Sequence, residues 1–194
     1  MAGEDSDTVS MKPEDLLAEH FSPLALPIIV EHSRCVAKKA LQIARGCPLA
    51  DSLDMTFIEE AALLHDIGVS LTDAPALDCH GSHPYICHGV LGRKILEKAG
   101  LPRHALVCER HIGVGLTVED IIAQGLPLPH RDMLPLSNEE KIIACADLFY
   151  SKKKMNLTTE KSLEKIKCNL AKFGSAKVAV FEGWVKEFSL LKEI

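Results

Sequence analysis

Apolar residues recur every three or four positions along most of this 194-residue chain. Between residues 24 and 44, for example, Ile29, Val36, Ala40 and Ile43 would share one face of a helix. No stretch shows the convincing alternation of apolar and polar residues that is typical of a strand, and no internal repeat is visible. The predicted helices cover residues 24–44, 55–67, 85–98, 103–111, 117–124, 139–153, 158–173 and 175–191. The pattern therefore predicts an all-α fold.

Residues that cap or break helices mark the predicted boundaries. Ser22 and Pro23 are typical of a helix start, and Gly46 followed by Pro48 is typical of a helix end. Residues 69–84 are rich in Thr, Asp, Pro, Gly and Ser, so they are predicted to form a long loop. Loops of this length in a compact domain are often functional, which makes the segment a candidate part of a site.

The helical pattern divides the chain into three parts. Residues 1–20 are predicted to be a disordered tail, because their first half is polar and lacks apolar periodicity. Residues 21–155 are predicted to form the main domain. Residues 156–194 are predicted to form an appendage of amphipathic helices that pack on this domain, and a homodimer interface is the alternative role for them.

Composition and charge narrow the classes of function. The net charge of −5 argues against general nucleic-acid binding, which needs a basic face, but a bound cation would still allow a small anionic substrate. Seven cysteines without a CxxC pair do not form a disulfide framework or a zinc ribbon. We interpret most of them as buried apolar residues, although Cys79, Cys87 and Cys108 lie near histidines and leave thiolate ligation open.

The chain shows no sign of a membrane or secretory protein. Its first residues are acidic and polar, unlike a signal peptide, and its longest apolar run is far shorter than the roughly 20 residues that span a bilayer. We therefore expect a cytoplasmic protein without a membrane partner.

Six residues with metal-binding side chains lie at helix ends or on apolar helix faces. Burial of an aspartate is unfavourable unless it is paired or binds a metal. Both aspartates, Asp66 and Asp147, lie in apolar surroundings and would need such a partner. Converging imidazoles and carboxylates would suit divalent cations. For each histidine by itself, a role as a core or surface residue is favoured over metal binding, and the adjacent His-Asp pair could equally cap a helix. The six residues are His32, His65, Asp66, His88, His111 and Asp147.

Their order and surroundings resemble those of a known group. His32, then His65-Asp66 within LLHDIG, then Asp147 is similar to the HD-domain superfamily of metal-dependent phosphohydrolases. More narrowly, HDIG followed by His88 in HGVLGRKIL and His111 in ERHIGVGLT resembles an uncharacterised HDIG-containing family of bacteria and archaea. The resemblance covers about residues 24–153 and implies the helical bundle of HD domains.

The resemblance also implies a binuclear centre. His32, His65, Asp66 and Asp147 would bind a first ion, and Asp66 would bridge to a second ion that His88 and His111 complete. The ions would be divalent transition metals, Fe or Mn, with Ni, Co and Mg as alternatives. Val69 stands where the cyclic-dinucleotide phosphodiesterases of the superfamily carry lysine after HDIG, and their GYP signature is absent. These departures argue against a cyclic-dinucleotide activity.

Three functions are compatible with these residues. The first is hydrolysis of a small phosphomonoester or phosphodiester, which includes nucleotides, at two metal ions. The second is the chemistry of superfamily members that hold a mixed-valent di-iron centre with the same six ligands and activate dioxygen. The third is a non-catalytic module that binds a ligand.

Further side chains are candidates for catalysis or substrate binding beside the bridging Asp66. Arg93 and Lys152 lie within one or two helical turns of a proposed ligand and could orient a phosphate, or they could be solvated helix residues. His80 and His83 in the predicted loop could act as general acids or contact the substrate. The alternative for both histidines is a polar surface loop.

Overall fold

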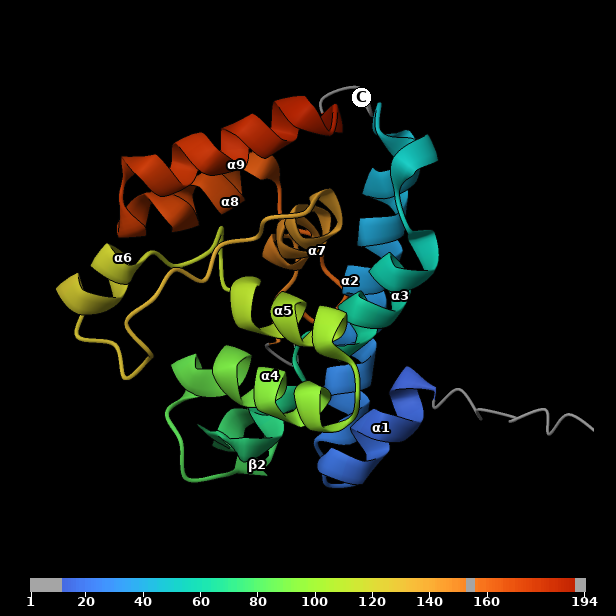
Figure 1. Ribbon diagram of the computed structural model, residues 1–194, viewed down its shortest axis with the longest axis vertical. Coiled ribbons are helices and arrows are strands. Elements are labelled where there is room, and N and C mark those ends of the chain that lie inside the picture. Colours follow the sequence, from blue (N-terminus) through green and yellow to red (C-terminus); the bar gives the residue numbers. More distant parts are fainter. Residues whose placement is uncertain (1–11, 153–155, 191–194) are drawn as a thin grey trace, which may run out of the picture.

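The computed structural model describes residues 12–152 and 156–190, and helices dominate them (Figure 1). This confirms the prediction of an all-α helical bundle. Most boundaries lie within a few residues of the predicted ones. The main helices are α1 Pro13–His20, α2 Leu26–Gly46, α3 Met55–Leu64, α4 His88–Lys98, α5 Pro102–Arg110, α6 Val118–Ala123, α7 Asn138–Leu148, α8 Leu163–Leu170 and α9 Ser175–Glu187.

Helix α1 corrects the predicted tail. Residues 13–20 are helical, and Leu16 and Leu17 are buried in an apolar cluster with Phe21 and α2 residues such as Ile29. The carboxylate of Glu14 also pairs with Arg34 of α2 at 2.8 Å. The prediction of a disordered tail is therefore wrong for residues 13–20, because this segment has enough apolar surface to pack against the rest of the chain. Residues 1–11 lie outside the described residues.

The predicted loop at residues 69–84 contains more regular structure than expected. It holds the short 3-10 helices η2 Ile67–Leu71 and η3 Pro75–Leu77, and the strands β1 Asp73–Ala74 and β2 Cys79–His80. The strands pair antiparallel, with Asp73 opposite His80 and Ala74 opposite Cys79. Each strand is too short to show a sequence alternation, which is why the pattern missed the pair.

Two apolar clusters hold the helices around the centre of the molecule. One joins α2, α3 and α7 and includes Ile43, Ile58 and Ile142. The same cluster contains Ile166 of α8 and Phe181 of α9, so the C-terminal helices pack directly on the rest of the chain. In Figure 1 these two helices lie beside α7. The other cluster joins α1, the beginning of α2 and the region around α4 and α5.

The segment that follows α7 is held in place by its own polar contacts. The ammonium of Lys161 donates hydrogen bonds to the carbonyl oxygens of Leu148, at 3.0 Å, and of Tyr150. The nearly buried Lys39 of α2 pairs with Glu160 at 2.7 Å. These contacts tie residues 160 and 161, just before α8, to the end of α7 and to α2.

Gly68 permits a close approach between η2 and α4. A Cβ at this position would lie 2.0 Å from the carbonyl oxygen of His88 and 2.3 Å from the amide nitrogen of Gly92. Both neighbours are backbone atoms, which cannot rotate away as a side chain can. Glycine at position 68 therefore lets the residues around Asp66 lie directly against the start of α4.

Candidate metal centre

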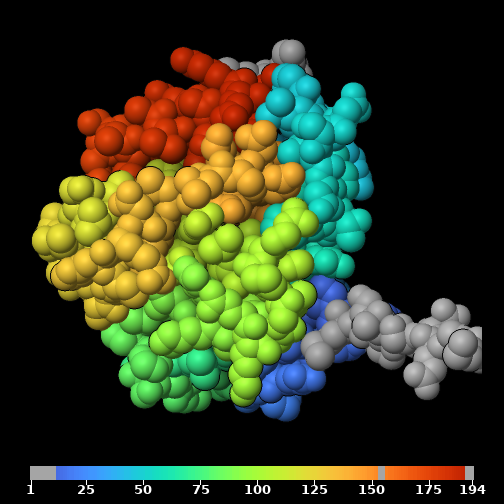
Figure 2. All heavy atoms as spheres, viewed as in Figure 1, coloured from blue at the N-terminus to red at the C-terminus, as the bar shows by residue number. Residues whose placement is uncertain are grey.

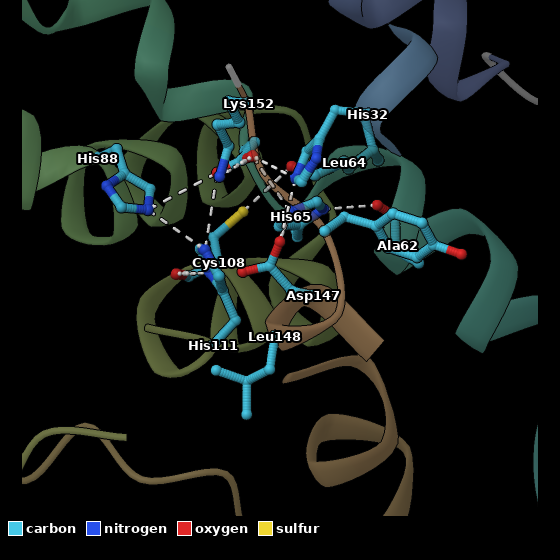
Figure 3. Close-up of polar contacts among 12 residues, drawn as sticks. His32, Ala62, Leu64, His65, His88, Cys108, His111, Asp147, Leu148 and Lys152 are labelled. Carbon is cyan, nitrogen blue, oxygen red and sulfur yellow. Dashed lines mark hydrogen bonds and ion pairs between the residues drawn. The ribbon is translucent and has the colours of Figure 1, made fainter. Parts of the chain in front are cut away.

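The six predicted ligands meet at one place (Figure 3). His32 comes from α2, His65 and Asp66 follow α3, and His88 begins α4, while His111 follows α5 and Asp147 lies near the end of α7. The side chain of Asp147 is 18% exposed, whereas that of Asp66 is fully buried. Asp147 is therefore the ligand that solvent can reach most readily.

The two oxygens of Asp66 face different histidines. Oδ2 lies 3.1 Å from Nε2 of His65 and 3.4 Å from Nε2 of His32. Oδ1 lies 3.6 Å from Nε2 of both His88 and His111. This is the arrangement that a carboxylate needs to bridge two cations.

Backbone carbonyl groups orient three of the imidazoles. Nδ1 of His65 lies 2.6 Å from the carbonyl oxygen of Ala62. Nδ1 of His88 and His111 each lie 2.8 Å from the carbonyl oxygen three residues earlier. A carbonyl accepts, so Nδ1 of each ring carries a proton, and Nε2 points into the cluster, where it could bind a cation in its unprotonated form. At the ends of α3 and α5 this contact also satisfies a carbonyl that has no partner within the helix.

Several polar atoms at the centre form no hydrogen bond. Among the described residues these include Nε2 of His65 and both oxygens of Asp66, which are buried, although Oδ2 of Asp66 forms an ion pair with Lys152. Nε2 of His88 and Nε2 of His111 lie 3.2 Å apart, although each is an acceptor in the neutral ring. Facing acceptors are unfavourable unless a cation lies between them.

The spacing of the donors fits bound metal ions. Ligands that each lie about 2.0–2.2 Å from one ion are separated from each other by roughly 3.0–3.5 Å. The pairs described above have separations from 3.1 to 3.6 Å, and Nε2 of His32 lies 3.0 Å from Oδ1 of Asp147. Two overlapping groups have all their donor atoms within 4.8 Å of one another: His32, His65 and Asp147, and His65, Asp66 and His111.

The electrostatics show that this cluster requires positive charge. Burial alone would raise the pKa values of Asp66 and Asp147, but His65 and Lys152 hold both well below their usual range. Burial would lower the pKa of His65, but the two carboxylates outweigh it and raise this pKa to about 10. Burial lowers the pKa of His88 to about 3, so its ring is neutral and can donate a lone pair.

Lys152 reaches the centre from the segment after α7. Its ammonium lies 2.8 Å from Oδ2 of Asp66, and its side chain is 15% exposed (Figure 3). Burial opposes the charge, but Asp66 and Asp147 raise the pKa of Lys152 well above its usual value. The lysine therefore stays charged beside the carboxylates, at a position where it can also meet a negatively charged ligand.

The other predicted catalytic side chains lie elsewhere. His80 is 67% exposed and its nearest charged partner is Asp78, at 3.7 Å. His83 is exposed, and its backbone pairs with Thr72 and Asp73. Among the described residues, neither histidine forms an ion pair or a hydrogen bond with the six predicted ligands, so their role as general acids or substrate contacts stays a prediction.

Arg93 also has a structural role that the sequence did not suggest. Its guanidinium binds Glu97 at 2.7 Å and the buried carboxylate of Glu109 at 2.6 Å, and Arg131 binds the same Glu109. Arg93 thus neutralises a buried charge between α4 and α5, and because its guanidinium is already paired we expect it not to orient a phosphate. Glu109 carried no signal in the sequence, because its two partners are 16 and 22 residues away.

We expect Arg93→Met to lower the free energy of unfolding by about 1–3 kcal/mol, because Glu109 loses one of its two cationic partners. The metal content and the turnover of any substrate should not change. Urea denaturation and metal analysis check this. Lys94→Met, at the next and exposed position of α4, is the matched control. Loss of turnover without loss of stability would restore Arg93 as a catalytic residue.

The cysteines near the histidines are not among the ligands. Cys108 lies close to the centre, but its thiol donates to the carbonyl oxygen of Leu64 at 3.3 Å (Figure 3). Burial raises the pKa of Cys108 well above its usual value, which disfavours the thiolate that a metal would need. The thiols of Cys79 and Cys87 point to the carbonyl oxygens of Leu77 and Pro127. These contacts favour the interpretation as buried apolar residues.

A cavity of about 460 Å³ adjoins the centre at Asp147. Its walls come from the region after α5, including Ile112 and Leu116, and from the C-terminal helices, including Leu170 and Phe173. Sequence reasoning treated the C-terminal residues as packing surface or as a dimer interface. No sequence signal could have placed them here, because the wall forms only when segments distant in the chain meet.

Comparison with known proteins agrees with the family resemblance that the sequence motifs indicated. A family model described as the HD domain matches residues 29–151. The chain belongs to the HD-domain family. A protein of Methanocaldococcus jannaschii with no assigned function is 39% identical over 132 residues, which are 66% of this chain and 70% of that protein. Membership of the narrower HDIG-containing family stays a prediction.

Two further comparisons involve proteins whose names state other activities. It is 36% identical over 121 residues, or 62% of its length, to a tRNA (cytidine(56)-2'-O)-methyltransferase of Picrophilus torridus, of which the match covers only 30%. The HD domain of the L. monocytogenes phosphodiesterase PgpH, solved with cyclic-di-AMP, superposes with a TM-score of 0.52 at 15% identity, covering 93% of this chain and 95% of that one. The second likeness supports the fold alone.

No helix in residues 12–152 or 156–190 is both long enough and apolar enough to cross a membrane.

Proposed function

We propose that this chain is a metal-dependent phosphohydrolase that acts on a small phosphomonoester or phosphodiester, with nucleotides among the candidates, at a binuclear centre. The observation that carries the proposal is the position of Asp66, whose two oxygens face two separate groups of histidines. The carboxylate is fully buried, and its Oδ1 faces His88 and His111 without a hydrogen bond, which supports the presence of a cation there in addition to the charge of Lys152 at Oδ2. Fe and Mn fit this mixture of imidazole and carboxylate ligands, as do Co and Ni, whereas Mg prefers oxygen ligands.

When bound, two divalent cations would activate a water molecule near neutral pH and offset the charge of the phosphoryl oxygens. The residues of the chain would do the positioning. His32, His65 and Asp147 would hold one cation, His88 and His111 would complete the second, and Asp66 would join the two. The ammonium of Lys152 would stabilise the negative charge that develops on the phosphoryl group.

The relatives do not extend this assignment to a particular substrate. PgpH is a phosphodiesterase solved with cyclic-di-AMP, but at 15% identity its ligand does not transfer. Most of the tRNA methyltransferase has no counterpart in the match, so we do not propose methyl transfer for this chain.

The test is hydrolysis of p-nitrophenyl phosphate and bis(p-nitrophenyl) phosphate by the full chain loaded with Mn²⁺ or Fe²⁺, under anaerobic conditions. We expect release of p-nitrophenol without oxygen and its loss on chelation. Failure with a wide range of phosphoesters would overturn the proposal. Oxygen consumption with an organic substrate would then support the di-iron oxygenase, and tight ligand binding without turnover would support the non-catalytic module.

We expect Lys152→Met to reduce kcat by about 100-fold, because it removes one electrostatic contact to the developing charge. The two metal ions should stay bound, since no metal ligand changes. Steady-state kinetics and metal analysis check this. Lys98→Met, an exposed change in the last turn of α4, is the control. An unchanged kcat would show that Lys152 only balances the charge of Asp66.

A further inference from the structure

We infer that the cavity beside Asp147 binds the organic part of the substrate and selects a phosphoester with an aromatic or heteroaromatic group of about nucleobase size. This inference rests on the proposed phosphohydrolase function and adds the substrate class to it. The cavity volume of about 460 Å³ lies within the range of sites that hold small organic ligands.

The position of the cavity connects it to the metal centre. Asp147 belongs both to the cluster of metal ligands and to the cavity wall, and it is the carboxylate ligand with an exposed part. Ile112, which directly follows the ligand His111, also lines the cavity. A substrate whose phosphate meets the cations at Asp147 would therefore extend its organic part into this space.

The walls favour an apolar, flat group. Leu116 and Leu126 line one part, and Ile166, Leu170 and Phe173 line the part formed by α8 and η6 (Ala171–Phe173). Apolar walls of this kind favour a ring over a polyol or a sugar, whose hydroxyl groups would lose hydrogen bonds to water. Phe173 is 63% exposed at the surface, so its ring is free to stack on an aromatic group.

The polar groups of the cavity suit a neutral ring with hydrogen-bonding edges. The ammonium of Lys177 is already bound to Asp120 and to the carbonyl oxygen of Gly115, and Lys161 is bound to Leu148 and Tyr150. The side-chain amides of Gln124 and Asn169 line the wall and make no hydrogen bond with the rest of the described chain. They can donate to and accept from a heteroaromatic edge.

Two parts of the chain must meet to form this wall. Figure 2 shows the C-terminal helices in contact with the segment around α6 on the same face of the molecule. The ion pair between Lys177 of α9 and Asp120 of α6 joins them. The C-terminal helices thus take part in substrate selection, in addition to packing on the HD domain.

The test is calorimetric titration of the full, Mn²⁺-loaded chain with two phosphonates that cannot be hydrolysed. We expect 1-naphthylphosphonate to bind on the order of 100-fold more tightly than methylphosphonate, because only the former buries a ring. Phe173→Ala should weaken naphthylphosphonate binding by about three- to tenfold and leave methylphosphonate unchanged. Val180→Ala, also an exposed apolar residue of the C-terminal helices but outside the cavity, is the control.

The possible outcomes separate this inference from the proposed function. Equal affinities for the two phosphonates, no binding of either, or no effect of Phe173→Ala would overturn the aromatic specificity. Selective naphthylphosphonate binding without hydrolysis of any phosphoester would support the cavity assignment and contradict the hydrolase. Hydrolysis without any preference for aryl over alkyl phosphoesters would support the hydrolase and contradict the cavity assignment.

Discussion

Asp66→Asn is expected to reduce phosphoester turnover by more than about 100-fold and to lower the metal content below two ions per chain. Loss of an outer-shell partner of a metal ligand already weakens metal binding by about 10–100-fold, and Asp66 contacts both groups of histidines directly. The substitution keeps the shape of the side chain and removes only its charge. Metal analysis of the purified variant, together with steady-state kinetics at saturating Mn²⁺, measures both effects.

A matched control separates the bridging role from a general effect of charge. Asp51→Asn removes a carboxylate from the exposed turn η1 (Ala50–Ser52), so the metal content and kcat should stay as in the unmodified chain. If Asp66→Asn kept two metal ions and full activity, the bridging assignment would be wrong. Loss of activity with both ions retained would assign Asp66 a role in the chemical step alone.

Gly68→Ala is expected to lower the free energy of unfolding by about 3 kcal/mol or more, because the added Cβ has no room against the backbone of α4. In a chain of this size that corresponds to a fall in Tm of about 6–12 °C. Any relaxation must move η2 away from His88, so the metal affinity should fall as well. Thermal unfolding monitored by circular dichroism, with and without Mn²⁺, measures both changes.

The control for Gly68 is a glycine with free space around it. Gly183 lies within α9, and a Cβ there would meet no atom within 4 Å. Gly183→Ala should raise stability by up to about 1 kcal/mol, because alanine favours a helix and glycine does not. If both variants had the same Tm as the unmodified chain, the close approach of η2 to α4 would not be essential.

The residues that converge at the centre could be picked out from the sequence because part of their signal is local. His65 and Asp66 stand together in a short motif, and Asp147 is a carboxylate in an otherwise apolar helix. Helix boundaries were predictable for the same reason, since caps such as Ser137 and stops such as Gly100 act on their immediate neighbours. Helix α1 was missed because its apolar surface depends on only Leu16, Leu17 and Phe21, too few positions to establish a period.

The sequence failed where the relevant contact is distant in the chain. Arg93 looked free to bind phosphate because nothing near it indicates that Glu109 is buried and needs a cation. Lys152 could be proposed but not placed, because its position depends on Lys161 and Lys39 holding the segment after α7. The cavity was invisible because Ile112 and Phe173 become neighbours only in the folded molecule.

The spread of the ligands along the chain has a consequence for folding. His32 and Asp147 are 115 residues apart, yet their side chains lie 3.0 Å from each other. A partly folded chain therefore cannot present the complete set of donors, and a cation gains its full affinity only from the finished structure. By mass action, a rising concentration of free metal shifts the population toward the native state. The ions would thus act as a lock on the tertiary structure, independently of any reaction they assist.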